Sequence, residues 1–222
     1  MIPLLLVGVA YLVGATPTSY WVGRAISGTD LRRVGSGNLG ATNVLRVLGW
    51  KAAVPVLLID VAKGWLPVAL FPLVDGSGAA GMALAYGAAT ILGHVFSFWV
   101  GFRGGKGVAT STGVFLALAP WALLIAFGVW LVVVSTTRMV SLGSILAGVT
   151  LPLAVWLTPH RGGEWTVPFT VALALFVVWA HRANIARILR GEENRFGSSR
   201  ASASPEPDEP GDHLETPRTT PP

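Results

Sequence analysis

Long apolar blocks separated by short polar segments run through the first 180 residues and limit this chain to few folds. The blocks cover residues 2–23, 52–74, 79–100, 108–134, 140–157 and 165–180. Most are close to the roughly 20 residues that a helix needs to cross a bilayer. Only 12% of the residues are charged, against about 25% in soluble domains. Because lipid tolerates no unpaired backbone groups, the blocks predict an all-α polytopic integral membrane protein.

The fourth block, residues 108–134, predicts two short helices that turn near Pro120. One continuous helix would be about 40 Å long, whereas the hydrocarbon is roughly 30 Å thick, and a proline interrupts the helical hydrogen bonds. With the turn, every Lys and Arg except Lys63 and Arg161 falls on one side. Basic residues prefer the cytosolic side, so we expect seven transmembrane helices, with the N-terminus outside and the C-terminus cytosolic. Both segments beside Pro120 are expected to be too short to cross squarely.

The composition excludes several classes of function. The chain has no cysteine, so disulfides, thiol catalysis and Cys-metal sites are excluded. No His pair has metal-ligand spacing and no nucleophile motif is present, so neither a metal, a cofactor nor an acyl-enzyme is expected. The formal charge of +5 lies mainly in loops and does not indicate a nucleic-acid partner. We expect a membrane-embedded domain over residues 1–196, with no removed signal peptide, and a disordered cytosolic tail over 197–222.

The segment GFRGGKGVAT, residues 101–110, has the character of a phosphate-binding loop. Backbone N–H groups of Gly104, Gly105 and Gly107 can converge on an anion, and Lys106 adds a positive charge. The helix expected after them would point its positive end to the same place. The Walker pattern is absent, because Val100 and Gly107 stand where it needs glycine and Ser or Thr. A flexible basic loop at the membrane surface is the alternative.

A second polar segment, GSGNLGATNVLR, runs from Gly35 to Arg46. It fits a turn followed by a helix N-cap. It also fits a second anion site, in which Arg46 offers a planar fork to phosphate oxygens and small hydrogen-bonding side chains surround it. Those side chains are Ser36, Asn38, Thr42 and Asn43.

The third segment, HRANIARILRGEENR, starts at His181. As a helix it would place His181 and Asn184 on one face. A histidine at the end of a span is more often an interfacial or capping residue than a catalyst. Ser144, and Ser141 before it, could reach the same side of the membrane. Asp60 and Lys63 are three residues apart within the second span, as a functional site or a packing pair, and His94 is expected to be structural.

Together the segments SGNLGATNVLR, GHVFSFWVGFRGGKGVAT and HRANIARILRGEENR resemble the motifs of the bacterial acyl-phosphate:glycerol-3-phosphate acyltransferases. The match extends from residue 2 to about 196, in the family's order and approximate spacing, and DVAKG at residues 60–64 also resembles a family segment. Ser97 stands where the family usually has proline. The resemblance implies transfer of an acyl group from acyl phosphate to glycerol 3-phosphate at the cytosolic face of the bacterial inner membrane, in phospholipid synthesis.

The resemblance also implies the residues of the pocket. Catalytic residues would be Ser36, Lys106, His181 and Asn184. Substrate-binding residues would be Arg46, Asn38, Thr42, Asn43, Gly104, Gly105, Gly107 and Ser144. Expected partners are the two phosphorylated substrates and membrane lipid. A lipid or anion transporter, or a non-enzymatic scaffold, remains as an alternative.

Overall fold

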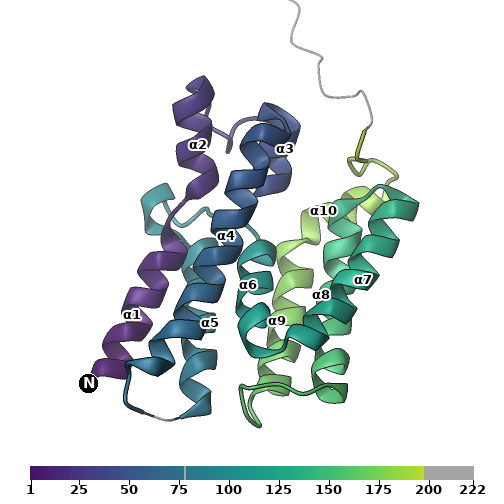
Figure 1. The fold of residues 1–222 in the computed structure, drawn as a ribbon. Coiled ribbons are helices and arrows are strands. Elements are labelled where there is room, and N and C mark those ends of the chain that lie inside the picture. Colours follow the sequence, from purple (N-terminus) through teal and green to yellow (C-terminus); the bar gives the residue numbers. More distant parts are fainter. Residues whose placement is uncertain (78, 198–222) are drawn as a thin grey trace, which may run out of the picture.

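The computed structural model describes residues 1–77 and 79–197, and over these ranges the chain is helical with no strand (Figure 1). This confirms the all-α expectation, while the expected tail lies outside the described residues apart from its first residue. The α-helices are α1 (Ile2–Ala15), α2 (Thr18–Ser27), α3 (Ala41–Leu48), α4 (Trp50–Leu70), α5 (Ala80–Val95), α6 (Val108–Leu118), α7 (Pro120–Thr137), α8 (Val140–Leu157), α9 (Thr166–Ala180) and α10 (Arg182–Leu189). Short 3-10 turns, η1 (Phe71–Leu73) and η2 (Phe98–Val100), follow α4 and α5.

Five helical segments of the described chain are long and apolar enough to cross a membrane. They are Ile2–Ser27, Trp50–Leu73, Gly81–Val100, Pro120–Thr137 and Val140–Leu157. A sixth span arises if α9 and α10, which are bent by 57° relative to each other, are taken together. Helix α6 has 11 residues and is too short to count by itself. Among the described residues there are therefore five or six candidate spans, against the seven expected from the sequence, and α6 is a shorter apolar helix.

The break at Pro120 is present. Helix α6 ends at Leu118, Ala119 adopts φ −149° and ψ 66°, and Pro120 begins α7, where its missing N–H is not needed. Figure 1 shows the chain reversing direction at this point. The expectation that both segments are too short was wrong for α7, which has 18 residues and ends at Thr137. In its last turn the Thr137 hydroxyl donates to Val133 O, and Arg138 ends the helix in the left-handed capping conformation.

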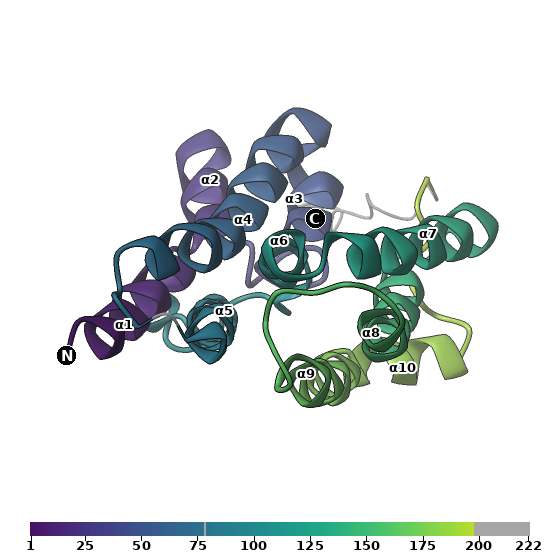
Figure 2. The same ribbon diagram turned by 60° about the horizontal axis from the view of Figure 1, so that its bottom comes forward.

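Helix α6 lies at the centre of the bundle, between α4 and the group formed by α7, α8 and α9 (Figures 1 and 2). Two glycines allow α4 and α6 to cross in backbone contact. A Cβ on Gly64 would lie 2.0 Å from Thr110 O, and one on Gly113 would lie 1.9 Å from Val61 O. The other side of α6 enters the largest apolar core through Val114, Phe115 and Leu118. Packing against α4 on one side and against this core on the other explains how so short a helix is held within the apolar layer.

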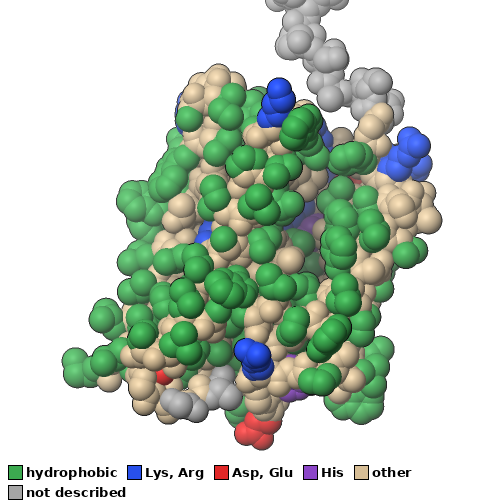
Figure 3. All heavy atoms as spheres, viewed as in Figure 1, with side chains coloured by type: hydrophobic (Ala, Val, Ile, Leu, Met, Phe, Trp, Pro, Cys, Tyr) green, Lys and Arg blue, Asp and Glu red, His purple; other side chains and the backbone are tan. Residues whose placement is uncertain are grey.

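The polar segments gather at one end of the bundle. Figure 1 shows α2, α3 and α10 at this end and the N-terminus at the other. Most Lys and Arg side chains visible in Figure 3 lie at the α2, α3 and α10 end. The same view shows a hollow between α4 and α7 near this end, with histidine and basic side chains inside it and apolar side chains along its walls. All three sequence motifs therefore reach the same end of the molecule.

Candidate active site

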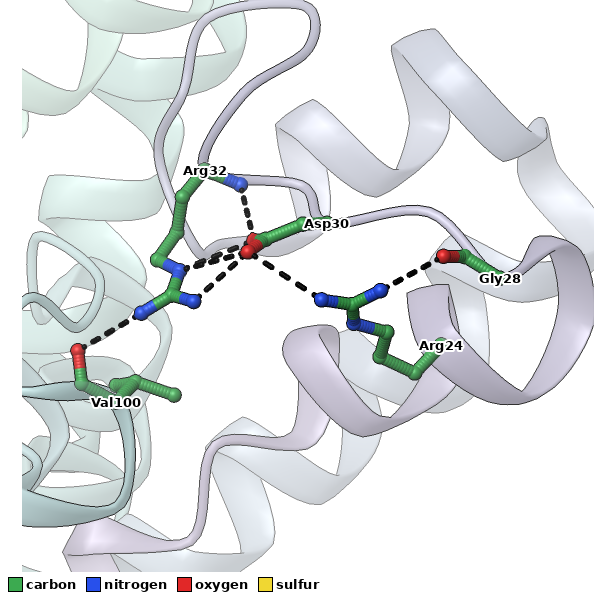
Figure 4. Close-up of polar contacts among 5 residues, drawn as sticks. All are labelled: Arg24, Gly28, Asp30, Arg32 and Val100. Atoms are coloured by element: carbon green, nitrogen blue, oxygen red, sulfur yellow. Dashed lines mark hydrogen bonds and ion pairs between the residues drawn. The ribbon is translucent and has the colours of Figure 1, made fainter.

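The loop between α2 and α3, residues 28–40, is fastened to the segment that leads into the glycine-rich loop (Figure 4). Asp30 accepts hydrogen bonds from the backbone N–H and Nε of Arg32, both at 3.0 Å. Arg32 also donates to Val100 O at 3.2 Å, and Arg24 pairs with Asp30 at 3.7 Å. The hydrogen bond from the Arg32 side chain is the main cause that lowers the pKa of Asp30 to about 2. Asp30 therefore stays ionised, and its ion pairs with Arg32 and Arg24 persist, at any physiological pH.

Asn43 holds the same loop in shape from within α3. Its Nδ2 donates to Leu31 O and Val34 O, both at 3.1 Å, and its Oδ1 accepts from Ser36 N at 2.8 Å and from Arg46 at 3.4 Å. All four hydrogen-bonding positions of this 1% exposed amide are occupied by the chain. Asn43 thus orders the loop through contacts within the chain.

The glycine-rich loop packs directly against the first loop. A Cβ on Gly105 would lie 2.6 Å from Leu39 O and 2.2 Å from His94 Nε2. The N–H groups of Gly104 and Gly105 are not free, because they donate to Val95 O at 2.9 Å and to His94 O at 3.2 Å. Gly107, at φ +81°, is the N-cap of α6. Of the donors expected over residues 104–107, the N–H groups of Gly104 and Gly105 thus bond within the chain, while Lys106 lies next to the N-terminus of α6.

Lys106 meets the third motif. Its Nζ donates to Asn184 Oδ1, and Asn184 Nδ2 donates to Glu193 Oε1 at 2.7 Å. Glu193 also accepts from Ser141 Oγ at 2.8 Å and from Arg187 Nε at 2.8 Å. Because Ser141 lies on α8 and Glu193 follows α10, this carboxylate ties two helices to the lysine. The ammonium of Lys106, the amide of Asn184 and the carboxylate of Glu193 are thus joined by consecutive hydrogen bonds.

The field around Lys106 favours anions. Burial first, and then the charges of Arg187 and Arg46, lower the pKa of Lys106 to about 8, although Glu193 acts in the opposite direction. Burial also lowers the pKa of Arg46, again with Glu193 and Arg187 acting on it in opposite directions. Three cations thus face one carboxylate in a partly desolvated space. A phosphate would relieve that imbalance.

His181 lies at the junction of α9 and α10, 4% exposed. Its Nδ1 lies 2.8 Å from Val177 O, and a carbonyl can only accept, so Nδ1 carries a proton. The neutral ring therefore keeps the lone pair on Nε2. An imidazole held in one tautomer by a backbone carbonyl is suited either to accept a proton or to orient a hydroxyl.

The structure joins most of the predicted residues, but not all. Arg46, Lys106, His181 and Asn184 interact within one group of charged and polar side chains. Ser36 is linked to Arg46 through Asn43. The side chains of Ser36, Asn38 and Thr42 make no hydrogen bond to another described residue, so they are open to a ligand. Ser144 instead donates to Val140 O within α8 at 2.9 Å, while its neighbour Ser141 reaches the cluster.

Two residues of the cluster were not among those predicted for the site, namely Glu193 and Arg187. The third motif is strongly basic, and Glu193 is an acidic residue within it. Its side chain is only 5% exposed. A buried carboxylate needs several hydrogen-bond donors. An acidic residue inside a basic segment was therefore the sequence signal that could have indicated Glu193 as part of the site.

The fold and the cluster together define a class: a helical integral membrane protein in which three polar segments bring several cations together at one end. The glycerol-3-phosphate acyltransferase family profile matches residues 4–191. The glycerol-3-phosphate acyltransferase of Chlorobaculum parvum is 40% identical over 90% of this chain and 98% of its own length. That of Geobacter sulfurreducens is 45% identical over 87% of this chain and 97% of its own.

Solved structures agree. The crystal structure of PlsY (YgiH), an integral membrane glycerol 3-phosphate acyltransferase, in its glycerol 3-phosphate form superposes with a TM-score of 0.81 at 38% identity, covering 88% of this chain and 96% of that one. Its lysophosphatidic acid form gives a TM-score of 0.78 at 36% identity, over 88% and 95% of the two chains. The present chain belongs to the glycerol-3-phosphate acyltransferase family and is an acyltransferase.

Proposed function

We propose that this enzyme moves a fatty acyl group from acyl phosphate to the 1-hydroxyl of glycerol 3-phosphate, giving lysophosphatidate and inorganic phosphate. The observation that carries the proposal is the group of Arg46, Lys106 and Arg187 around the single carboxylate of Glu193. Two phosphorylated substrates bring several negative charges to one place, and such a group neutralises them. The relatives crystallised with glycerol 3-phosphate and with lysophosphatidic acid support both ends of the reaction.

The chemistry needs no acyl-enzyme. An acyl phosphate is a mixed anhydride, so the glycerol O1 attacks the acyl carbon and forms an ester bond. The bond from that carbon to the phosphate oxygen breaks, and phosphate leaves with the electron pair. The hydroxyl proton goes either to His181 Nε2 or to a phosphate oxygen of the donor, in which case His181 only orients the glycerol. Lys106 and the N-terminus of α6 stabilise the charge that develops on the phosphate.

We further propose a seven-helix topology in the bacterial inner membrane, in which α6 is the short seventh element. The N-terminus would be outside and the site, with α3 and α10, would face the cytosol. The separation of basic side chains to the α2, α3 and α10 end supports this orientation. The acyl chain would then reach the site from the bilayer through the hollow between α4 and α7.

The decisive experiment supplies the purified protein with acyl phosphate and glycerol 3-phosphate and measures phosphate release and lysophosphatidate. Acyl-CoA and acyl-carrier protein replace acyl phosphate in parallel reactions. Turnover with acyl phosphate alone supports the assignment, and turnover only with a thioester overturns the donor. A lipid or anion transporter would move substrate into vesicles without consuming acyl phosphate. An Arg46→Ala/Lys106→Ala variant separates an enzyme from a scaffold, because a scaffold tolerates the change.

A further inference from the structure

A charged pair lies buried inside the helical bundle. Lys63 Nζ lies 2.7 Å from Asp60 Oδ1, and the two residues, on α4, are 4% and 1% exposed. Lys63 also donates to Thr16 O at 2.8 Å, a carbonyl left at the break between α1 and α2. Burying a charge within a membrane span costs free energy, so a charged pair at this position indicates a structural or functional role.

His94 on α5 connects this pair to the glycine-rich loop. Its Nδ1 lies 3.9 Å from Asp60 Oδ1, and the residue is 7% exposed. On the other side of the ring, Nε2 lies 2.2 Å from the place that a Cβ on Gly105 would occupy. The backbone carbonyl of His94 accepts the Gly105 N–H at 3.2 Å, and that of Val95 accepts the Gly104 N–H at 2.9 Å. One residue therefore touches both the buried pair and the loop.

The contacts form a chain that runs from the loop through His94 to Asp60 and Lys63. Two carbonyls at the end of α5 hold the backbone of Gly104 and Gly105, and the next residue is Lys106. The position of the Gly104–Gly105 backbone depends on where the His94 ring lies, because the ring fills the space next to Gly105. The carboxylate of Asp60, itself fixed by Lys63, lies against the opposite edge of the ring. Lys63 in turn is anchored to the α1–α2 break, where Ser97 also donates to Ala15 O.

We propose that Asp60, Lys63 and His94 are positioning residues: a buried support that sets the backbone of residues 104–106, and hence the ammonium of Lys106, without contacting substrate. The inference rests on the role proposed above for Lys106. A pair that served only α1–α4 packing would affect stability and nothing else. A support for the loop also changes the KM for glycerol 3-phosphate and the mobility of the loop.

Two sets of variants test the support. Asp60→Asn/Lys63→Met removes both charges together, so no unpaired buried charge remains. His94→Gln leaves the pair intact and adds no charge. Asp75→Asn is the matched control, because Asp75 is a buried aspartate at the opposite end, bonded to Tyr86 at 2.7 Å. We expect the first two to raise the KM at least about tenfold in protein that remains folded, and the control to leave it unchanged.

A second readout does not depend on substrate. The chain has no cysteine, so Arg103→Cys, at an exposed loop position, accepts a single nitroxide label. Its spectrum should show a more mobile loop in both support variants and an unchanged loop in Asp75→Asn. Wild-type KM and label mobility in folded His94→Gln would overturn the proposal, even if the double variant fails to fold. If the wild type does not use glycerol 3-phosphate, the proposed function fails, and the label spectra still decide this inference.

Discussion

Lys106 donates a hydrogen bond to the side-chain oxygen of Asn184, 78 positions further along the chain. The same amide of Asn184 donates to Glu193, so a cation and a carboxylate are connected through one side chain. The second and third motifs therefore meet at a single contact. The ammonium of Lys106 belongs to the residue just before the N-cap of α6, and the partial positive charge of the helix N-terminus adds to its field.

Lys106→Ala should lose most of the activity while the protein still inserts and purifies normally. The ammonium neutralises phosphate in a partly desolvated place, and deletion of one such stabilising group costs about 10²–10³ in kcat. Lys51→Ala is the matched control, because Lys51 is an exposed lysine at the start of α4. Phosphate release by the purified variants measures the effect. Wild-type turnover in Lys106→Ala would remove this residue from the site.

The pH dependence of kcat/KM should report Lys106. Its pKa in the free enzyme is lowered from the usual range to about 8, first by burial and then by Arg187 and Arg46. The cation is therefore complete below about pH 7 and is lost as the pH rises through 8. Substrate phosphate, with a second pKa near 6, stays a dianion over this range. We expect kcat/KM for glycerol 3-phosphate to fall with a limb near pH 8.

Lys106→Arg tests that limb, because a guanidinium does not deprotonate in this range. The variant should have lower activity, since the fork of arginine does not reproduce a point charge, but its alkaline limb should disappear. A limb of equal position in Lys106→Arg would assign the titration to another group.

The features that depend on local sequence patterns could be predicted from the sequence. The apolar blocks indicated the helices, Pro120 marked the break, and a spacing of three placed His181 and Asn184 together. The sequence could not reveal which serine of α8 reaches the site, since that depends on how the helix is rotated against α10. Both Ser141 and Ser144 were expected to reach this side and Ser144 was assigned to the substrate, whereas the side chain that contacts Glu193 is that of Ser141.

The two glycines of the loop illustrate the same limit. A glycine-rich sequence is equally compatible with N–H groups that face a ligand and with N–H groups that face the protein. Here Gly104 and Gly105 face α5, since they follow its last turn closely enough to bond its carbonyls. Their lack of a side chain allows close backbone packing against α5 and the first loop.

Gly105→Ala should therefore disable the enzyme through sterics. The added methyl would lie 2.2 Å from His94 Nε2 and 2.6 Å from Leu39 O, which is closer than real Cβ atoms approach. The loop must shift, so the KM for glycerol 3-phosphate should rise about tenfold or more. Gly81→Ala, in α5 with open space around it, is the control and should be neutral or slightly stabilising. Equal kinetics in both variants would contradict the packing described here.

Glu193→Gln should lower the melting temperature of the detergent-solubilised protein at pH 7. Burial opposes ionisation of Glu193, but hydrogen bonds from Asn184, Ser141 and Arg187 outweigh it and lower its pKa. A lowered pKa contributes stability above the unfolded value, about 4.3, that is lost as the pH falls through the folded one. The variant should therefore lose less stability than wild type on acidification. Glu192→Gln, an exposed neighbour paired with Arg190, should match wild type.

His181→Gln separates the two paths for the proton. The ring carries its hydrogen on Nδ1, bonded to Val177 O, and leaves Nε2 as the acceptor. If Nε2 takes the hydroxyl proton, kcat should fall about 10²–10⁴-fold. If the donor phosphate takes the proton, glutamine can still orient the glycerol, so the KM rises while kcat changes little. Steady-state kinetics from pH 5 to 9 distinguish these results, and activity that survives largely intact excludes His181 as the base.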